Sequence, residues 1–161
     1  MADMFDKQTR SRIMRAVRTA ETEPEERLAV ALKALGLRFR RNDARIFGRP
    51  DFVFRRARLA VFVDGDFWHG RSWFQEGTAP ATNADFWIDK FERNRRRDRL
   101  VNCELRRGDW SVLRLWASDV RKAPIASAGR VRARLRRLAR LRRPLPVTGP
   151  QSRRRSRHSS A

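Results

Sequence analysis

Apolar residues recur at helical spacing in three parts of the chain. Between Pro24 and Leu35 they fall at i, i+3, i+4 and i+7, which predicts a helix with one buried face. Thr22, followed three residues later by Glu25, predicts a capping box at the start of this helix. Gly36 predicts its end, because glycine readily adopts the left-handed conformation that closes a helix.

Two further helices are predicted towards the C-terminus. Residues 84–106 form a long charged stretch with apolar contributions from Phe86, Ile88, Phe91 and Leu100. The second helix carries the apolar stripe Val131, Leu135, Leu138 and Leu141, and arginines occupy its opposite face. Pro144 and Pro146 end this helix. Residues 6–18 are compatible with a helix but are only weakly amphipathic, so a mobile arm is the alternative.

Four short segments have the composition of strands. Residues 37–40 alternate apolar and charged side chains, whereas 51–56 and 58–64 are rich in Val and Phe and too short for buried helices. The gap between these last two is small enough for a hairpin, and residues 110–116 make the final strand. The order α-α-β-β-β-α-β-α predicts an α/β fold with a central mixed sheet flanked by helices.

The chain carries a strong positive charge. Its 161 residues include 39 Lys or Arg and 18 Asp or Glu, which gives a formal net charge of +21, and all but four of the basic residues are Arg. Such a charge attracts polyanions. Nucleic acid is favoured over an anionic membrane surface, because the guanidinium group matches phosphates and base edges.

This charge is unevenly distributed. Residues 130–161 hold twelve Arg and no carboxylate, so residues 1–129 account for the other +9. From residue 151 onward no apolar residue occurs before the final Ala. We therefore predict a disordered basic tail over residues 144–161, whose simplest role is to solubilise the protein and to add non-specific DNA affinity.

Two features bear on the compartment. No stretch approaches the ~18 apolar residues of a membrane span, and the first ten residues lack the apolar core of a signal peptide. Cys103 is the single cysteine, which excludes an internal disulfide and an all-cysteine zinc site. We expect a cytoplasmic protein with no membrane partner.

Candidate chemistry lies around the predicted hairpin. Asp51 begins one strand and Asp64 ends the next, so a hairpin would bring both to one end of the sheet, where they could bind a hard cation such as Mg²⁺. A Pro-Asp pair before a strand opens the PD-(D/E)XK nuclease pattern, although Asp at a strand start is often only a turn residue. His69 is a candidate general base, or else a packed, hydrogen-bonded histidine beside aromatic neighbours.

Five stretches stand in order along the chain: MADMFDKQTRSRIMRAVRT, GRPDFVF, FVDGDFWHG, PATNADFWIDKFERNRRRDR and GDWSVLRLW. Together they resemble the very-short-patch repair endonuclease family over about residues 1–142. FWH combined with FWxxKxxRNxxRD is far more specific than the Pro-Asp pair alone. Residues 1–143 are therefore predicted to form an endonuclease domain.

The resemblance implies a restriction-endonuclease-like core and a defined reaction. Family members nick one strand of double-stranded DNA beside the T of a T·G mismatch, which arises by deamination of 5-methylcytosine. The resemblance also implies a monomeric, nucleoid-associated bacterial protein with functional links to a cytosine-5 methyltransferase and to mismatch-repair proteins. Two alternatives stay open: a related nuclease with another DNA substrate, and a non-catalytic basic DNA- or RNA-binding protein.

Catalytic roles also follow from the resemblance. Asp51 matches the Mg²⁺-binding aspartate, and Val63 stands where the family offers a backbone carbonyl to the metal. His69 matches the general base, Asp98 the carboxylate that orients it, and Glu25 a carboxylate that holds metal-bound water. Glu25 can also simply complete the capping box, and Asp98 can be one charge of a salt-bridged helix face.

Aromatic residues form a second group. Phe67, Trp68 and Trp87 match positions that the family wedges into the duplex beside the mismatch, where flat side chains replace lost base stacking. Core packing is the alternative, and it explains Trp110 and Trp116 better. The other DNA contacts that the resemblance implies are Arg49 and, within an N-terminal DNA-contacting arm over residues 1–19, Met14 and Arg15.

The chain departs from the family at two places. Well-studied relatives hold a structural zinc with Cys and His, and the corresponding positions here are Asp66, Arg71, Trp73 and Ala117. We therefore predict no zinc, and expect Trp73 and Phe74 to fill that space by apolar packing. Asp64 stands where some relatives place a histidine near the leaving group; it cannot act as an imidazole at neutral pH, but it could bind Mg²⁺.

Overall fold

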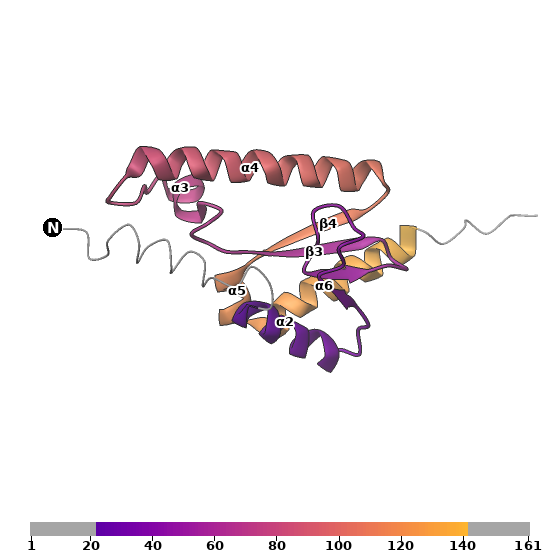
Figure 1. Cartoon of the computed structure of the whole chain (residues 1–161). Helices are drawn as coiled ribbons and strands as arrows, with labels where there is room; N and C mark the ends of the chain where they lie inside the picture. The colour runs from indigo at the N-terminus through magenta and orange to yellow at the C-terminus, as the bar shows by residue number, and fades with distance from the viewer. Residues whose placement is uncertain (1–21, 142–161) are drawn as a thin grey trace, which may run out of the picture.

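Helices cover both faces of a four-stranded sheet (Figure 1). The computed structural model describes residues 22–141. The helices are α2 (Glu23–Ala34), α3 (Arg71–Glu76), α4 (Ala84–Arg107), α5 (Ala117–Lys122) and α6 (Pro124–Leu141), and the strands are β1 (Arg40–Arg41), β2 (Phe52–Phe54), β3 (Leu59–Asp64) and β4 (Ser111–Trp116). This α/β arrangement confirms the predicted fold class and is consistent with a restriction-endonuclease-like core.

The sheet has the predicted mixed topology. Its strand order is β1-β2-β3-β4, in which β1, β2 and β3 pair antiparallel and β4 pairs parallel to β3. Phe52 faces Val61 across the β2–β3 hairpin, and Val63 faces Leu115 across the parallel pair. A parallel pair needs a crossover connection, and the segment that contains α3 and α4 supplies it.

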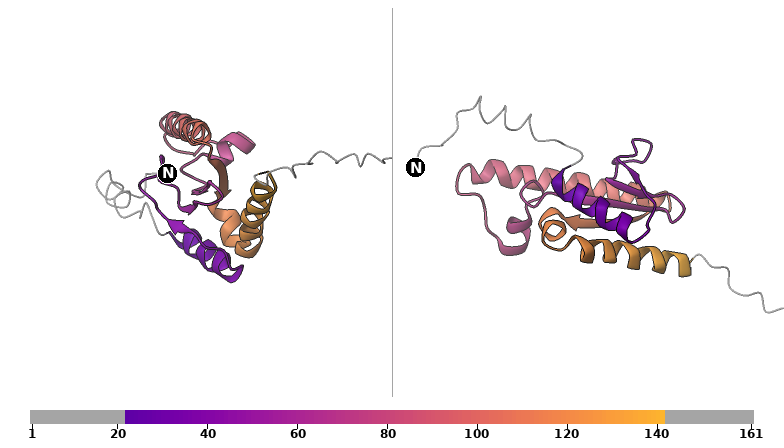
Figure 2. Two further views of the ribbon diagram at one scale, coloured as in Figure 1. Left: turned by 90° about the vertical axis from the view of Figure 1, so that its right-hand side faces the viewer. Right: turned by 90° about the horizontal axis from the view of Figure 1, so that it is seen from below.

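β3 divides its side chains between two hydrophobic cores, because successive residues of a strand point to opposite faces of the sheet. Leu59 and Val61 belong to a core shared with α2, α5 and α6, whereas Ala60 and Phe62 belong to a second core under α4. Figure 2 shows the resulting layers: α4 lies on one face of the sheet, and α2 and α6 lie on the other.

α2 lies where it was predicted, but its first turn differs. Thr22 is the N-cap residue, yet its hydroxyl donates to Oε1 of Glu25 at 2.7 Å and caps no backbone N–H. The two side chains of the expected box bond to each other and not to the backbone of the first turn. The predicted capping box is therefore wrong, whereas Gly36, with a φ of +70°, follows the end of the helix as predicted.

The strand predicted at residues 37–40 is almost entirely absent. Pairing with β2 involves only Arg40 and Arg41. Leu37 and Phe39 pack against the core formed with α2, so their alternation with polar neighbours reflects burial in a connection and not a ladder of hydrogen bonds.

The helix predictions also need correction in part. α3 and α5 were not predicted; each has only six residues, too few to display a helical period. α6 begins at Pro124, ahead of the predicted stripe, because proline is well suited to the first turn. Leu141 at the end of that stripe is 70% exposed, and α4 leaves Phe86 and Leu100 more than half exposed.

Several predictions concern parts of the chain outside the described residues. These are the helix or arm at the N-terminus, with Met14 and Arg15, and the basic tail at 144–161. Within residues 22–141, no helix combines the length and the apolar character needed to cross a membrane.

Candidate active site

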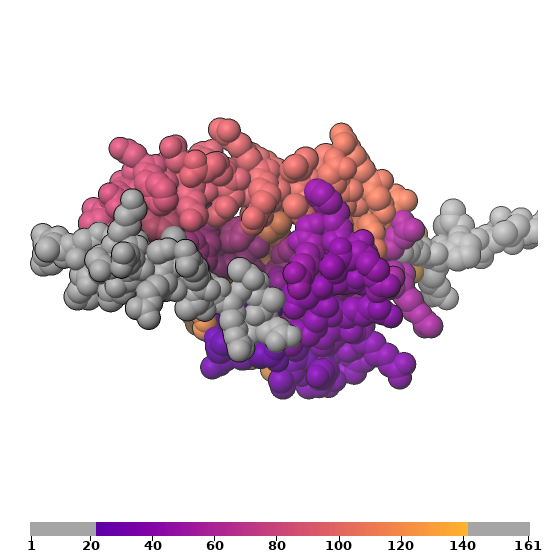
Figure 3. All heavy atoms as spheres, viewed as in Figure 1, coloured from indigo at the N-terminus to yellow at the C-terminus, as the bar shows by residue number. Residues whose placement is uncertain are grey.

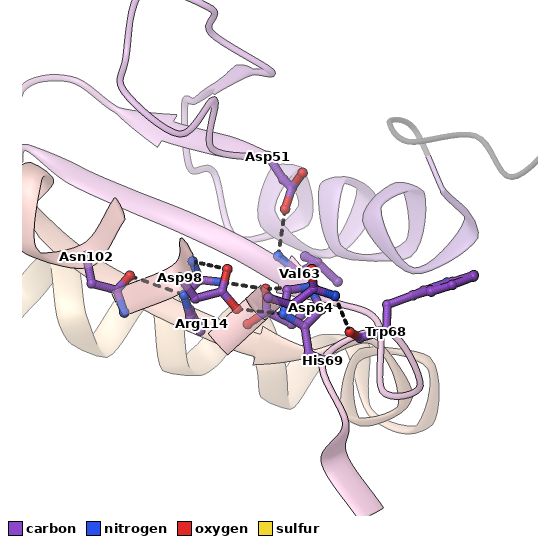
Figure 4. Close-up of polar contacts among 9 residues, drawn as sticks. Asp51, Val63, Asp64, Trp68, His69, Asp98, Asn102 and Arg114 are labelled. Atoms are coloured by element: carbon purple, nitrogen blue, oxygen red, sulfur yellow. Dashed lines mark hydrogen bonds and ion pairs between the residues drawn. The ribbon is translucent and has the colours of Figure 1, made fainter. Parts of the chain in front are cut away.

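Two carboxylates meet at one end of the β2–β3 hairpin. Asp51 precedes β2 and Asp64 ends β3, and the antiparallel register places the start of one strand beside the end of the other. The backbone N–H of Val63 donates to Oδ2 of Asp51 at 2.6 Å (Figure 4). The predicted convergence of these residues is confirmed.

His69 reaches the same group from the loop that follows β3. Its Nδ1 lies 2.7 Å from Oδ2 of Asp98, which comes from α4. An ionised carboxylate can only accept, so Nδ1 carries the proton of this bond and neutral His69 keeps its lone pair on Nε2. Nε2 lies 3.8 Å from Oδ1 of Asp64, which is beyond hydrogen-bond distance.

The turn that carries His69 is fixed by its neighbours. Gly70 has a φ of +62°, and a Cβ there would lie 2.7 Å from Cγ of Phe91, so glycine is required on both counts. Asn94 of α4 donates to the carbonyl of Trp68 at 2.6 Å, and the His69 N–H donates to the carbonyl of Gly65. Asn94, which stands in the FWxxKxxRNxxRD motif, thus holds the loop against α4. The sequence alone did not show this role.

Arg114 is a second residue of the site that the sequence did not reveal. It lies on β4, beside β3, and its Nη1 donates to Oδ1 of Asp64 at 2.6 Å while its Nη2 lies 3.2 Å from Oδ1 of Asp98. Its Nε donates to Asn102 at 3.2 Å. The only local signal was a charged residue inside an apolar strand, Val112 to Trp116, and that pattern also fits an ordinary solvent-facing position.

These side chains open onto one cavity. Its volume is about 500 Å³, and its wall includes Asp51, Val63, Asp64, His69, Asp98 and Arg114. Arg49 and Arg97 also line it, so cations flank the carboxylates. In the space-filling view, the segment between β1 and β2 reaches the ridge formed by α4 (Figure 3). Gly48 of this segment and Val101 of α4 both line the cavity.

The protonation of Asp51 is strongly perturbed. Burial raises the pKa of Asp51 to about 7; the hydrogen bond from Val63 opposes this rise, and the charges of Glu25 and Asp64 add to it. Near neutral pH a cation would therefore compete with a proton for this carboxylate.

Asp64 and Asp98 respond differently to burial. Burial raises the pKa of Asp64 above its ordinary value, although the charge of Arg114 opposes the rise. For Asp98, burial also acts to raise the pKa, but the hydrogen bond from His69 and the charge of Arg114 outweigh it and the pKa is lowered. Asp98 thus stays ionised beside His69.

Glu25 lies behind this group and not in the cavity wall. Its residue is 3% exposed, and its carboxylate accepts from Thr22 and lies 3.8 Å from Nη2 of Arg41. It is close enough to Asp51 to affect the charge of that carboxylate. The structure therefore brings Asp51, His69 and Asp98 into one cavity wall, while Glu25 is buried and lies near enough to Asp51 to act on its charge.

The three predicted wedge residues form one aromatic cluster. The ring centroids of Phe67 and Trp87 are 4.7 Å apart, and those of Trp68 and Trp87 are 6.0 Å apart. Phe67 is 48% exposed, and Nζ of Lys90 lies 5.3 Å from the centre of the Trp68 ring. Figure 4 shows the Trp68 side chain pointing away from the carboxylates. The cluster is thus partly open to solvent, beside the cavity.

A polar network holds the loop that carries His69. Nη1 of Arg71 donates to Asp66, Ser118 and Asp119 at 3.0, 2.6 and 2.9 Å, and Ser118 donates its backbone N–H to Asp66. Trp73 and Phe74, expected to fill this space, belong to neither core, and α3 has no buried residue. Both side chains are partly buried, and Arg95 lies 4.2 Å from the centre of the Phe74 ring, so their packing role stays a prediction. Ionic hydrogen bonds join the loop to α5.

Three comparisons with known proteins bear on this site. Residues 2–75 match the family model described as DNA mismatch endonuclease Vsr. The chain is 45% identical over 134 residues to the type II nicking enzyme V.NmeDIP of Neisseria meningitidis serogroup C, which covers 83% of this chain and 90% of that protein. It is 43% identical over 121 residues to the DNA mismatch endonuclease Vsr of Escherichia coli (strain K12), covering 75% of this chain and 77% of that protein.

The fold, the site and these relatives together define a DNA endonuclease, a hydrolase of phosphodiester bonds. Within that class, the chain belongs to the DNA mismatch endonuclease Vsr family. The predicted resemblance is thereby confirmed over the part of the chain that the matches span.

Proposed function

We propose that this enzyme nicks one strand of double-stranded DNA beside the T of a T·G mismatch, by Mg²⁺-dependent hydrolysis. The observation that carries the proposal is the pairing of His69 with Asp98 in the wall of the cavity that also holds Asp51. A base and a cation-binding carboxylate are the two groups that phosphodiester hydrolysis needs side by side. The relatives named as nicking enzymes and as a mismatch endonuclease support the same conclusion.

His69 serves as the general base in this proposal. With its Nδ1 proton donated to Asp98, Nε2 is the nitrogen that takes a proton from water. The lowered pKa of Asp98 keeps a negative charge beside the ring, which stabilises the imidazolium as the proton arrives.

Mg²⁺ would be held by Asp51 and the carbonyl of Val63, with Asp64 as a further candidate. The residues fit a cation because burial disfavours Asp51 as an anion without a counter-charge. The Val63 N–H bonds to Oδ2 of Asp51 and leaves Oδ1 for the ion. Among residues 22–141, no three His, Cys, Asp or Glu side chains converge on one ion, so water would complete the shell, as Mg²⁺ accepts. When bound, the ion would act as a Lewis acid for the charge that develops on the phosphate. Glu25 would support it through water.

Mismatch recognition is proposed for the aromatic cluster of Phe67, Trp68 and Trp87. Flat apolar side chains compensate for stacking lost at a kinked step, and a mispair is easier to unstack than a matched pair. The cluster adjoins the catalytic loop, because Phe67 and Trp68 immediately precede His69. Arg49 at the cavity wall would hold the phosphate backbone.

A single assay tests the proposed reaction. A strand-labelled duplex with one T·G mismatch and its fully matched counterpart are incubated with the full chain and Mg²⁺. We expect a nick beside T in the mismatched duplex alone, lost in Asp51→Ala and in His69→Ala and retained in Asp89→Ala, which removes an exposed carboxylate of α4. Equal cleavage of both duplexes would point to another DNA substrate, and binding without cleavage to a non-catalytic role.

The proposed substrate also carries a biological context. A T·G mispair from 5-methylcytosine implies a functional link to a cytosine-5 methyltransferase and to mismatch-repair proteins. The proposed enzyme acts as a monomer, which the measured mass of the complex with one duplex tests directly.

A further inference from the structure

Arg114 lies at the centre of the carboxylates, although the proposed reaction gives it no role. It contacts Asp64, Asp98 and Asn102, one with each guanidinium nitrogen. Its Cζ lies 4.5 Å from the centre of the Phe62 ring, which backs the guanidinium. With all three nitrogens engaged by oxygens of the site, the group is arranged to hold the site together more than to grip DNA.

Asp98 is held at both of its oxygens. Oδ2 accepts from Nδ1 of His69, and Oδ1 lies 3.2 Å from Nη2 of Arg114. A carboxylate held at one oxygen can turn about its last torsion angle, whereas one held at two cannot turn without breaking a contact. Arg114 therefore fixes the plane in which Asp98 meets the imidazole.

Asp64 faces the opposite nitrogen of the same ring. Its Oδ1 lies 3.8 Å from Nε2 of His69, and the same oxygen accepts from Arg114 at 2.6 Å. A small rotation would bring this carboxylate within hydrogen-bond distance of Nε2. It would then stabilise a proton on the very nitrogen that has to accept one from water. The contact with Arg114 draws Asp64 away from that position.

We propose that Arg114 is a positioning residue that sets the hydrogen bonding of His69, by fixing Asp98 on Nδ1 and restraining Asp64 from Nε2. The inference rests on the proposed role of His69 as the general base. Arg114 touches neither water nor DNA in this role; it acts through the two carboxylates.

The first test replaces Arg114 with methionine, which keeps the length of the side chain and removes its donors. Arg106→Met is the matched control, because Arg106 is an exposed arginine of α4. At saturating Mg²⁺ we expect Arg114→Met to lower kcat about 10- to 100-fold, less than the ~10²–10⁴-fold typical of losing a general base, with KM for DNA as in the control. A raised KM with unchanged kcat would make Arg114 a DNA contact and overturn the inference.

A spectroscopic measurement separates positioning from a general loss of structure. The Nδ1 proton of His69, shared with a carboxylate at 2.7 Å, should give a low-field proton NMR signal in the unmodified chain and in Arg106→Met. We expect this signal to shift or broaden in Arg114→Met. A signal identical to that of the control would contradict the proposal.

The third arm uses Asp64. Because Asp64 is also a candidate Mg²⁺ ligand, this arm is read at saturating Mg²⁺ and against Asp64→Asn alone. In the Arg114→Met background, Asp64→Asn removes the charge of the competing acceptor, so the double variant should be several-fold more active than the product of the two single losses. Losses that simply multiply would overturn the restraint of Asp64 by Arg114.

If Arg114→Met does not fold, Arg114→Lys is used instead. It keeps the charge, so its kcat should lie between that of the unmodified chain and that of His69→Ala. Nicking retained in His69→Ala would overturn the proposed base itself, whereas an inactive His69→Ala beside a fully active Arg114→Met would overturn only the positioning role of Arg114.

Discussion

Asp51 links the chemistry of the site to the stability of the fold. Its pKa is raised to about 7 by burial, so between about pH 4 and 7 the folded chain keeps a proton that the unfolded chain has lost. The unfolded state then binds fewer protons, and the contribution of Asp51 to stability falls as the pH rises through this window. A tenfold change in proton affinity corresponds to about 1.4 kcal/mol, so the effect amounts to a few kcal/mol.

We predict that Asp51→Asn removes this pH dependence. In EDTA, urea unfolding should show that the stability of the variant, relative to the unmodified chain, increases from pH 4.5 to pH 7.5. Added Mg²⁺ should stabilise the unmodified chain at the higher pH, because binding to the folded state adds to its stability, and should have little effect on the variant. Parallel pH profiles for the two proteins would show that Asp51 ionises freely in the fold.

Asp98→Asn isolates the charge beside His69 from the shape of its neighbour. The amide can still face Nδ1, but it carries no charge and can stabilise either tautomer. We predict a loss of at least about 10²-fold in kcat, with DNA affinity nearly unchanged. Quantitative nicking under single-turnover conditions and a binding titration measure the two effects separately. Asp89→Asn, on an exposed turn of the same helix, should retain full activity.

The residues of the site differ in how far the sequence could predict them. Asp51, His69 and Asp98 each stand in a short, continuous sequence motif, which is why the sequence could identify them. The structure brings these three side chains into one cavity wall. The importance of Arg114 depends on the parallel pairing of β4 with β3, which joins segments 50 residues apart and leaves no local signature. Glu25 is buried and does not line the cavity, but its charge acts on Asp51, so its role near the metal stays a prediction.

At the scale of elements, the loop between β3 and α3 depends on Arg71. This arginine joins the beginning of that loop, at Asp66, to the beginning of α5, at Ser118 and Asp119. Its guanidinium also lies over the ring of Trp116, 5.3 Å from its centre. Phe67, Trp68 and His69 stand between Asp66 and Arg71, so the network holds both ends of the loop for which we propose a catalytic role.

We predict that Arg71→Met loosens this loop. The substitution removes the hydrogen bonds that the guanidinium donates to Asp66 and Asp119. This loss should lower the free energy of unfolding by about 1–3 kcal/mol, measured by urea unfolding. Hydrogen exchange should accelerate selectively in residues 66–76, and kcat should fall more than DNA affinity. Arg93→Met removes an exposed arginine of α4 as a control. Unchanged exchange in the loop would mean that other contacts hold it.

Elements with many residues of one period were predictable, and short ones were not. α2 and α4 show the apolar spacing that their buried faces require, and their bounds lie within about two residues of the prediction. α3 and α5 depend on tertiary contacts: Arg71, at the start of α3, bonds to Ser118 and Asp119, at the start of α5. The error at β1 has a similar origin, since Leu37 and Phe39 are buried without being paired.

At the scale of the whole molecule, basic side chains occur on both sides of the sheet. Arg49 and Arg97 line the cavity on the side of α4, whereas α6 carries a row of exposed arginines on the side of α2. Because the sheet separates α4 from α6, a short duplex in the cavity cannot lie on the outer face of α6 at the same time (Figure 2). The large net charge therefore consists of parts with different access to DNA.

Salt titration distinguishes these parts. For each phosphate that the protein no longer neutralises, the slope of log K against log salt becomes shallower by about 0.9. With a short mismatched duplex, we predict a shallower slope for Arg97→Gln and no change for the combined Arg132→Gln and Arg136→Gln variant of α6.

Deleting residues 144–161, which include four Arg, should also flatten the slope if the tail reaches phosphate. An unchanged slope would assign those arginines to solubility alone. A flattened slope in the α6 variant, with the short duplex, would contradict the separation of the two faces. It would mean that DNA wraps around the edge of the sheet, and that the charge of α6 belongs to the same binding surface as the cavity.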